Sequence, residues 1–351
     1  MPNVFEVANG FREERLASER KAATALLNAY GDAWQRIKAL LDKLTGEIKQ
    51  LEDAGGTVSQ AWLYRYDRLK TLRSQVEHEI RHFARNADAS VTDQQREAVK
   101  AAGADTLQLV MTQLGPEAAR AAQIEQRWNR VPLEATSNLV GTLQSGPLKA
   151  LMDTLPLNAG EAVSKALKTG IVLGSGPRKI AQDVKQALGG DLVRALRISR
   201  TEVLRSYRSA GIQNYRENSD VIDGWTWMAS LSKRTCAMCL AMSGTFHKLS
   251  EEFGSHVNCR CTPVPHTRPI EAILGSSEQT ALMSRPEVGV PDGKSWFAHQ
   301  PPAVQEHILG PGKYAAFQEG LITLDDLVGY EDNSKWGPQR FELSLAKALA
   351  K

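Results

Sequence analysis

Apolar residues recur at steps of three and four along the first 130 residues, a spacing that keeps them on one face of an α-helix. The longest such stripe predicts a helix of about 40 residues, roughly 60 Å long at 1.5 Å per residue. This helix should end at the segment DAGG, Asp53 to Gly56, because glycine is the usual helix terminator. The stripe consists of Leu26, Leu27, Tyr30, Trp34, Ile37, Leu40, Leu41, Leu44, Ile48 and Leu51.

A second stripe, which includes Leu69, Val76 and Phe83, predicts another long helix. A third helix is expected to start near Thr92, where the segment TDQQ offers an N-cap. Long helices joined by short turns bury their stripes on one another in a hairpin or small bundle. Residues 1–130 are therefore expected to form an elongated arm of long helices. Self-association through these helices is a further expectation, since full burial of a stripe can require another subunit.

Residues 131–217 are predicted to form a domain of shorter helices, because QSGP, LPLNAG, GSGP and LGGD interrupt the pattern. The last helix begins at Asp191 and carries arginines along its polar face. A solvated helix face is one interpretation of these arginines, and contact with nucleic acid or an acidic partner is the other. The arginines are Arg194, Arg197, Arg200, Arg205 and Arg208.

The pattern changes after Asn218, where VIDGWTWMAS alternates apolar and polar residues and predicts a strand. The prolines of CTPVPHTRP exclude a central strand for that later segment. Residues 218–270 are thus expected to form a small β-containing module, followed over 271–351 by a linker and a short helical tail. The predicted fold class is mainly α with a small α+β module.

All four cysteines of the chain lie within residues 236–261. Cys236 and Cys239 form a CxxC pair, Cys259 and Cys261 form a CxC pair, and His256 stands at HxxC spacing from Cys259. Zinc takes four tetrahedral Cys or His ligands, paired closely in sequence. Four of these five residues can therefore form a closed structural Zn²⁺ site, with either His256 or Cys261 as the fourth ligand. Disulfides and reduced thiols without metal are the alternatives.

Composition narrows the function classes. The chain is 42% hydrophobic and 24% charged, like an ordinary soluble globular protein, and its net charge of +3 is mixed along most of its length. That balance argues against a protein that mainly coats nucleic acid. The sequence contains no run of about 18 apolar residues, so no membrane span is predicted. No secretory signal is visible either. Clustered cysteines in such a chain favour metal binding over disulfides.

No enzymatic activity is predicted. The segment HEIRH, His78 to His82, matches the HExxH pattern of zinc peptidases. Its histidines lie about 200° round the helix from the apolar stripe, whereas a catalytic zinc needs a cleft. The segment around Gly293 to Ser295 resembles the end of a phosphate-binding loop, but Val288 stands where the first glycine belongs. No combination of nucleophile, base and acid emerges elsewhere.

The order of motifs points to a family. RISRTEVLRSYRSAGIQNY precedes the tryptophan-bearing strand, and SKRTCAMCLAMSGTFH and SHVNCRCTPVP follow it. This succession resembles the phage Mu F-like minor head proteins, also called phage head morphogenesis proteins. The resemblance is clearest over residues 190–265 and extends with lower specificity to 349. Val257 stands where the family often has proline, which leaves the choice of ligands open.

The resemblance implies a component of the tailed-phage head, present in few copies and associated with the portal during assembly. The expected partners are the portal protein, the major capsid protein or both, with packaged DNA as a further candidate. The virion head and, during assembly, the host cytoplasm are the expected locations. In some members of the family the protein affects DNA packaging or ejection. The alternative function is a zinc-containing DNA-binding or nuclease-like phage protein, in which the basic helix and the zinc module act together on DNA.

Overall fold

The computed structural model describes residues 3–57, 59, 62, 68–129, 131, 147–172, 175, 177–277, 289–333 and 337–351. The chain divides into two compact units. We call Ser18–Gln94 with Thr142–Glu202 the helical unit, and Met1–Ala17, Gln95–Gly141 and Val203–Lys351 the Cys/His unit. The fold is mostly helical with long N-terminal helices and small antiparallel sheets, so the predicted fold class is confirmed.

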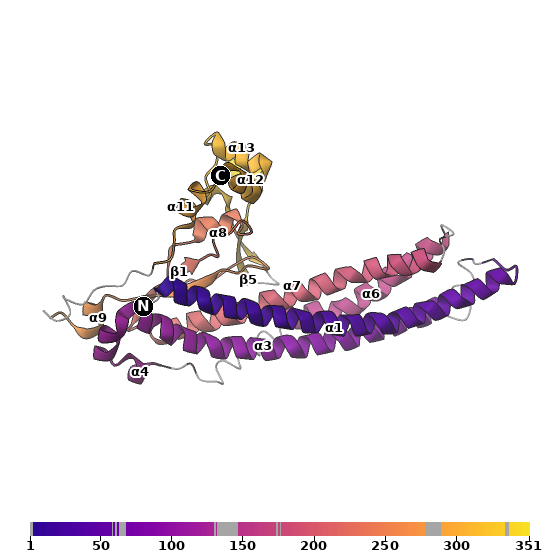
Figure 1. Ribbon diagram of the computed structural model, residues 1–351, viewed down its shortest axis with the longest axis horizontal. Helices are drawn as coiled ribbons and strands as arrows, with labels where there is room; N and C mark the ends of the chain where they lie inside the picture. The colour runs from indigo at the N-terminus through magenta and orange to yellow at the C-terminus, as the bar shows by residue number, and fades with distance from the viewer. Residues whose placement is uncertain are drawn as a thin grey trace. The chain divides into compact units, whose positions relative to one another are not determined.

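The helical unit consists of segments of four long helices, three of which continue into the Cys/His unit. The helices are α1 (Val4–Asp53), α3 (Arg68–Ala121), α6 (Pro147–Val172) and α7 (Pro177–Glu217). In this unit α1 packs on α3, where the rings of Tyr30 and Phe83 meet edge to face at a centroid distance of 5.3 Å. Within this unit the helices run alongside one another (Figure 1), and buried apolar side chains recur along them.

The predicted stripe of α1 is largely buried. Leu26, Tyr30, Ile37, Leu41, Leu44 and Ile48 are at most 9% exposed. Leu27 is 46% exposed, because a residue beside the stripe's centre turns towards solvent. The helix ends at Asp53, as the DAGG segment predicted, and Gly55 adopts a left-handed φ of 77° that favours glycine.

Three predicted helix breaks are wrong. The segment LPLNAG does not interrupt a helix, since α6 runs through it with Pro156 inside. No helix starts near Thr92, because α3 runs through this position and Thr92 is 7% exposed within it. The backbone of α3 departs from helical geometry at Gly115 instead, directly before Pro116. Gly189 and Gly190 do not end a helix either, since α7 is continuous over 41 residues. Glycine costs a helix interior only about 1 kcal/mol, which flanking buried residues offset.

The Cys/His unit is built around a three-stranded antiparallel sheet in the order β2-β1-β3. Its strands are β1 (Ile222–Met228), β2 (Phe246–Lys248) and β3 (Thr262–Thr267). The tryptophan-bearing segment therefore forms the central strand, and the proline-bearing segment forms an edge strand, as predicted. Proline is tolerated there because an edge strand needs fewer backbone donors.

Short elements complete this unit. Helix α8 (Ala237–Met242) follows β1, and the tail contains a β-hairpin that the sequence reading missed. The remaining elements are α4 (Ile124–Arg127), α9 (Ile270–Leu274), α11 (Gly293–Ala298), α12 (Pro302–Leu309), α13 (Pro311–Gln318), η2 (Asp325–Leu327), β4 (Val328–Asn333), β5 (Gly337–Glu342) and α14 (Leu345–Leu349). The predicted linker lies mostly on residues 278–288, outside the described part of the chain.

Aromatic side chains form the core around β1. Trp225 and Trp227 are both fully buried, as expected for core packing. The ring of His247 stacks on Trp225 with a centroid distance of 4.1 Å, and Phe253 stacks on Trp227 at 4.0 Å. The same core holds Cys239, Cys259 and Cys261, so the cysteines are part of the packing of the sheet.

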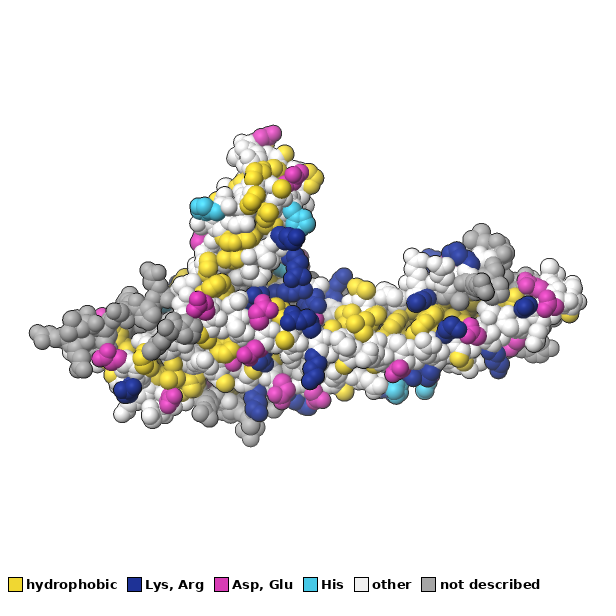
Figure 2. All heavy atoms as spheres, viewed as in Figure 1, with side chains coloured by type: hydrophobic (Ala, Val, Ile, Leu, Met, Phe, Trp, Pro, Cys, Tyr) yellow, Lys and Arg dark blue, Asp and Glu magenta, His cyan; other side chains and the backbone are white. Residues whose placement is uncertain are grey.

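The described helices are too short or too polar to cross a membrane. On the face shown in Figure 2, charged side chains of both signs alternate with apolar ones along the long helices. Exposed apolar residues of the helical unit include Leu27, Leu157 and Val193. These three side chains are 46%, 53% and 55% exposed, so part of the apolar surface of this unit is uncovered in the single chain.

Candidate metal centre

Two short segments supply the five predicted ligands. Cys236 is the N-cap residue of α8 and Cys239 lies one turn into it, so the two thiols share one face of the helix. His256, Cys259 and Cys261 follow β2 and lead into β3. Because β2 and β3 both pair with β1, the segment between these two strands lies close to α8, which follows β1.

The turn between His256 and Cys259 is closed by a backbone hydrogen bond, in which the Cys259 amide donates to the His256 carbonyl at 3.2 Å. Asn258 in this turn has a φ of 66°, a left-handed conformation that asparagine adopts more easily than most residues. The turn thus aims the imidazole and the Cys259 thiol to the same side without proline at position 257.

The spacing of the ligand atoms matches a tetrahedral zinc site. Nε2 of His256 lies 3.3 Å from Sγ of Cys236 and 3.4 Å from Sγ of Cys239. The Sγ atoms of Cys239 and Cys259 are 3.8 Å apart. Zn–S bonds of about 2.3 Å and Zn–N bonds of about 2.0 Å at tetrahedral angles place two sulfurs about 3.8 Å apart and sulfur and nitrogen about 3.5 Å apart.

Disulfides do not account for the cluster. All four cysteines are free, and the 3.8 Å between the Sγ atoms of Cys239 and Cys259 is far beyond the roughly 2.05 Å of an S–S bond.

The cluster contains two overlapping groups. Cys236, Cys239 and His256 have ligand atoms within 4.8 Å of one another, and so do Cys239, Cys259 and Cys261. Cys239 belongs to both groups. The five predicted residues are therefore brought together, and they can hold a metal ion.

The five candidate ligands differ in how readily they ionise. Hydrogen bonds with Cys239 and then His256 lower the pKa of the Cys236 thiol to about 6. Hydrogen bonds from Cys239 and Cys261 hold the pKa of Cys259 well below its usual value. Hydrogen bonding with Cys236, by contrast, raises the pKa of Cys239 well above its usual value. Burial lowers the pKa of His256, but its contacts with Cys236 and Cys259 outweigh burial and raise that pKa to about 11. A metal ion bound here would therefore displace protons from Cys239 and His256.

The imidazole of His256 is oriented for metal binding. Its Nδ1 lies 2.8 Å from the carbonyl oxygen of Val257 and can donate a hydrogen bond to it. When a metal displaces the second ring proton, this bond would select the neutral tautomer whose Nε2 carries the lone pair. That Nε2 is the atom that faces the thiols of Cys236 and Cys239.

The predicted arginines separate into different environments. Arg197 is exposed and Arg194 and Arg205 are half-buried, so their predicted contact with nucleic acid or a partner stays a prediction. Arg200 pairs with Glu19 at 2.7 Å within the helical unit. Arg208 is 5% exposed and donates to the carbonyl oxygens of Cys259 and Cys261, contrary to the expectation that it contacts an external partner.

Sequence reasoning also missed residues that support the cluster from a distance. Glu342 of β5 accepts a hydrogen bond from the Ala237 amide at 3.0 Å, directly after Cys236, and it pairs with Lys313. The Arg340 amide donates to the carbonyl of Gly254 at 3.1 Å, just before His256. The hairpin β4–β5 therefore fastens both ligand segments, a long-range relation for which no local sequence signal exists.

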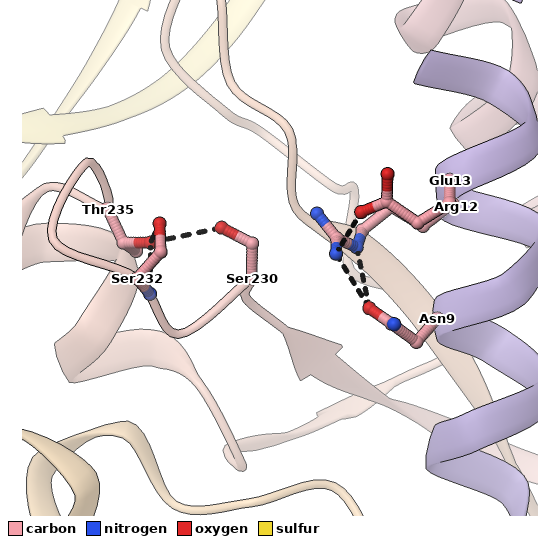
Figure 3. A network of polar contacts seen from close by, with 6 residues as sticks. All are labelled: Asn9, Arg12, Glu13, Ser230, Ser232 and Thr235. Carbon is pink, nitrogen blue, oxygen red and sulfur yellow. Dashed lines mark hydrogen bonds and ion pairs between the residues drawn. The ribbon is translucent and has the colours of Figure 1, made fainter. Parts of the chain in front are cut away.

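A hydroxyl-rich turn precedes Cys236. Oγ1 of Thr235 accepts a hydrogen bond from the Ser232 amide at 3.1 Å and lies 3.0 Å from Oγ of Ser230 (Figure 3). Figure 3 also shows Arg12 of α1, whose guanidinium donates to Oδ1 of Asn9 and pairs with Glu13. These hydrogen bonds of Thr235 order the backbone directly before Cys236, the first of the candidate ligands.

The HExxH segment does not form a comparable site in the described part of the chain. His78 and His82 are exposed on α3, and Glu79 pairs with Arg36. Nδ1 of His82 lies 3.4 Å from the side-chain amide of Asn86, four residues further along the helix. These contacts are typical of a solvated helix face.

Comparison with known proteins agrees with the motif order. No curated protein and no solved structure matches the chain. The model of the family described as "Phage Mu protein F like protein" matches residues 161–264, a segment that contains all of α7, strands β1 and β2, the start of β3 and the cysteine cluster. Members of this family are generally head morphogenesis proteins. The chain thus carries a phage Mu protein F-like domain over residues 161–264.

Proposed function

We propose that this protein is a minor head protein of a tailed phage that acts in head morphogenesis near the portal. The observation that carries the proposal is the match of residues 161–264 to the phage Mu F-like family, because this segment includes the clustered Cys/His ligands. The family implies capsid partners, and the portal protein and the major capsid protein are the proposed ones. The proposed role is architectural rather than catalytic, in the virion head and in the host cytoplasm during assembly.

The proposed cofactor is one structural Zn²⁺ held by Cys236, Cys239, His256 and Cys259. Two features support this set. Nε2 of His256 and the thiols of Cys236 and Cys239 have zinc-like spacings, as do the sulfurs of Cys239 and Cys259. Cys259 and Cys261 both group with Cys239, and the side chain of His256 interacts with those of Cys236 and Cys259. A closed set of four protein ligands leaves no position for a substrate, which fits a structural role.

The helical unit supports the assembly role. Long helices present an extended surface, and Leu27, Leu157 and Val193 expose apolar side chains on it. Self-association or docking on a capsid component through this surface would cover them. Arg194, Arg197 and Arg205 remain the proposed contacts for packaged DNA or an acidic portal surface, since Arg208 is engaged elsewhere.

The metal content of the purified protein tests the proposed site. Wild type should hold one zinc per chain by mass spectrometry. His256→Ala should lose it, and Cys261→Ala, the matched control in the same segment, should retain it. Loss of zinc only in Cys261→Ala would select the all-cysteine set, and wild type without zinc would refute the metal centre.

The same variants test the function in the phage. Without the gene, infection should yield few or aberrant heads, and a plasmid copy of the wild-type gene should restore them. His256→Ala should restore far fewer heads than Cys261→Ala, as counted by electron microscopy of lysates. Normal heads without the gene would refute the role in head morphogenesis, whatever the metal content.

A further inference from the structure

Arg208 has the most unusual environment of the described arginines. It lies on α7 within the Cys/His unit and is 5% exposed. Nε donates to the carbonyl of Cys261 at 2.8 Å, and one terminal nitrogen donates to the carbonyl of Cys259 at 2.7 Å. The other terminal nitrogen donates to Oγ of Ser255 at 3.0 Å, and the ring of Phe253 lies 5.2 Å from the guanidinium carbon. One guanidinium therefore holds the whole second ligand segment.

The charge of Arg208 has no acidic partner among the residues that the structure describes. Its acceptors are two carbonyl oxygens and one hydroxyl, which satisfy the hydrogen bonds but bring no formal negative charge. A buried charge that is not paired costs several kcal/mol in a protein interior. Since arginine does not lose its proton, the compensating negative charge must come from the neighbouring groups.

The neighbouring group that fits is the metal centre. Zn²⁺ with three thiolates and a neutral imidazole carries a net charge of −1, whereas Zn²⁺ with four thiolates carries −2. The single positive charge of Arg208 balances the set that contains His256.

We infer that Arg208 is the counter-charge and positioning residue of the loaded zinc site, an inference that rests on the proposed structural zinc. The guanidinium fixes the backbone of Cys259 and Cys261 and compensates the excess negative charge of the metal with its thiolates. Groups in the shell behind metal ligands commonly tune affinity in this way. Metal binding and burial of this arginine are therefore coupled.

Arg216 provides a matched control on the same helix. Its Nε donates to the carbonyl of Leu249 at 2.8 Å, so it also fastens α7 to the loop after β2. Unlike Arg208, it pairs with a carboxylate, that of Glu252, at 2.7 Å. Substitution of Arg216 removes a similar hydrogen bond between α7 and this loop but leaves the net charge around the cysteine cluster unchanged.

The experiment measures zinc affinity by competition with a chromophoric chelator, on the full-length wild type, Arg208→Gln, Arg208→Lys and Arg216→Gln. Far-UV circular dichroism checks that each is folded. Arg208→Gln should bind zinc roughly 10- to 100-fold more weakly. Arg208→Lys keeps the charge and should retain most of the affinity, and Arg216→Gln should resemble wild type.

The outcomes separate this inference from the proposed metal site. Wild type that binds no zinc would overturn both. Tight binding by wild type with equal affinity in Arg208→Gln, or an equal loss in Arg208→Gln and Arg216→Gln, would overturn the inference alone. If Arg208→Gln does not fold, Arg208→Lys decides, since an affinity loss of about 10-fold or more in that variant would assign the role to hydrogen-bond geometry instead of charge.

Discussion

The helical unit and the Cys/His unit are organised on different principles. In the helical unit, buried side chains such as Ile37, Leu155 and Val184 recur along each helix, and each contributes a small share of the core. In the Cys/His unit, the segment from β1 to β3 closes around five ligand side chains and one buried arginine. The helical unit thus depends on many similar apolar contacts, whereas the Cys/His unit combines an apolar core with a single cluster of candidate ligands.

This difference determines how each unit responds to damage. Loss of one stripe residue leaves a cavity that its neighbours partly fill. Loss of one ligand of the proposed zinc site should remove the ion, and with it the link between α8 and the segment before β3.

The largest effect is expected from Cys239→Ser, because Cys239 belongs to both ligand groups. Structural zinc can contribute on the order of 10 kcal/mol to the folding of a small module. The variant should therefore lose its zinc, and hydration of the core around β1 should shift tryptophan fluorescence to longer wavelength. Far-UV circular dichroism should retain most of its helical signal.

Chelation of wild type supplies the control for that substitution, since it removes the ion and leaves the sequence intact. The chelated protein should show the same fluorescence shift, and added zinc should reverse it. A single concerted loss of fluorescence and helical signal on chelation would contradict the separation of the two units.

The same contrast explains what could be predicted from the sequence. The stripe of α1 and its end at Asp53 follow from spacing and glycine alone, which are local signals. The hairpin β4–β5 escaped prediction because its strand segments, VGYEDN and GPQRFE, are polar and lack a clear alternation. Part of its anchoring comes from the distant bond between Arg340 and Gly254.

The cluster itself was predictable as a set of five residues, because CxxC and HxxCRC are short-range spacings. The role of Arg208 was not, since nothing local distinguishes it from Arg197 or Arg205 on the same helix. Only the tertiary fold turns one of these arginines towards the carbonyls of Cys259 and Cys261. The periodicity of the sequence predicts which residues share one face of the helix, whereas tertiary packing determines which of those residues are buried.

A smaller effect is expected in the helical unit from Leu155→Ala, which removes a fully buried side chain of α6. The cavity should lower the free energy of unfolding by about 2–5 kcal/mol. Leu157→Ala on the same helix is the control, because Leu157 is 53% exposed and its loss should cost less than about 0.5 kcal/mol. Zinc content should stay at the wild-type value in both variants, and zinc loss in Leu155→Ala would contradict the independence of the two units.

The smallest effect is expected from the double substitution His78→Ala and His82→Ala, which removes the histidines of the HExxH segment. Both side chains are exposed on α3, so the free energy of unfolding should change by less than about 0.5 kcal/mol for each. Zinc per chain should equal that of wild type, because the metal belongs to the cysteine cluster of the other unit. A second zinc in wild type that disappears in the double variant would show instead that this helix face also binds metal. In that case the exposed HExxH segment would bind metal as the cysteine cluster does, and the two units would no longer differ in this respect.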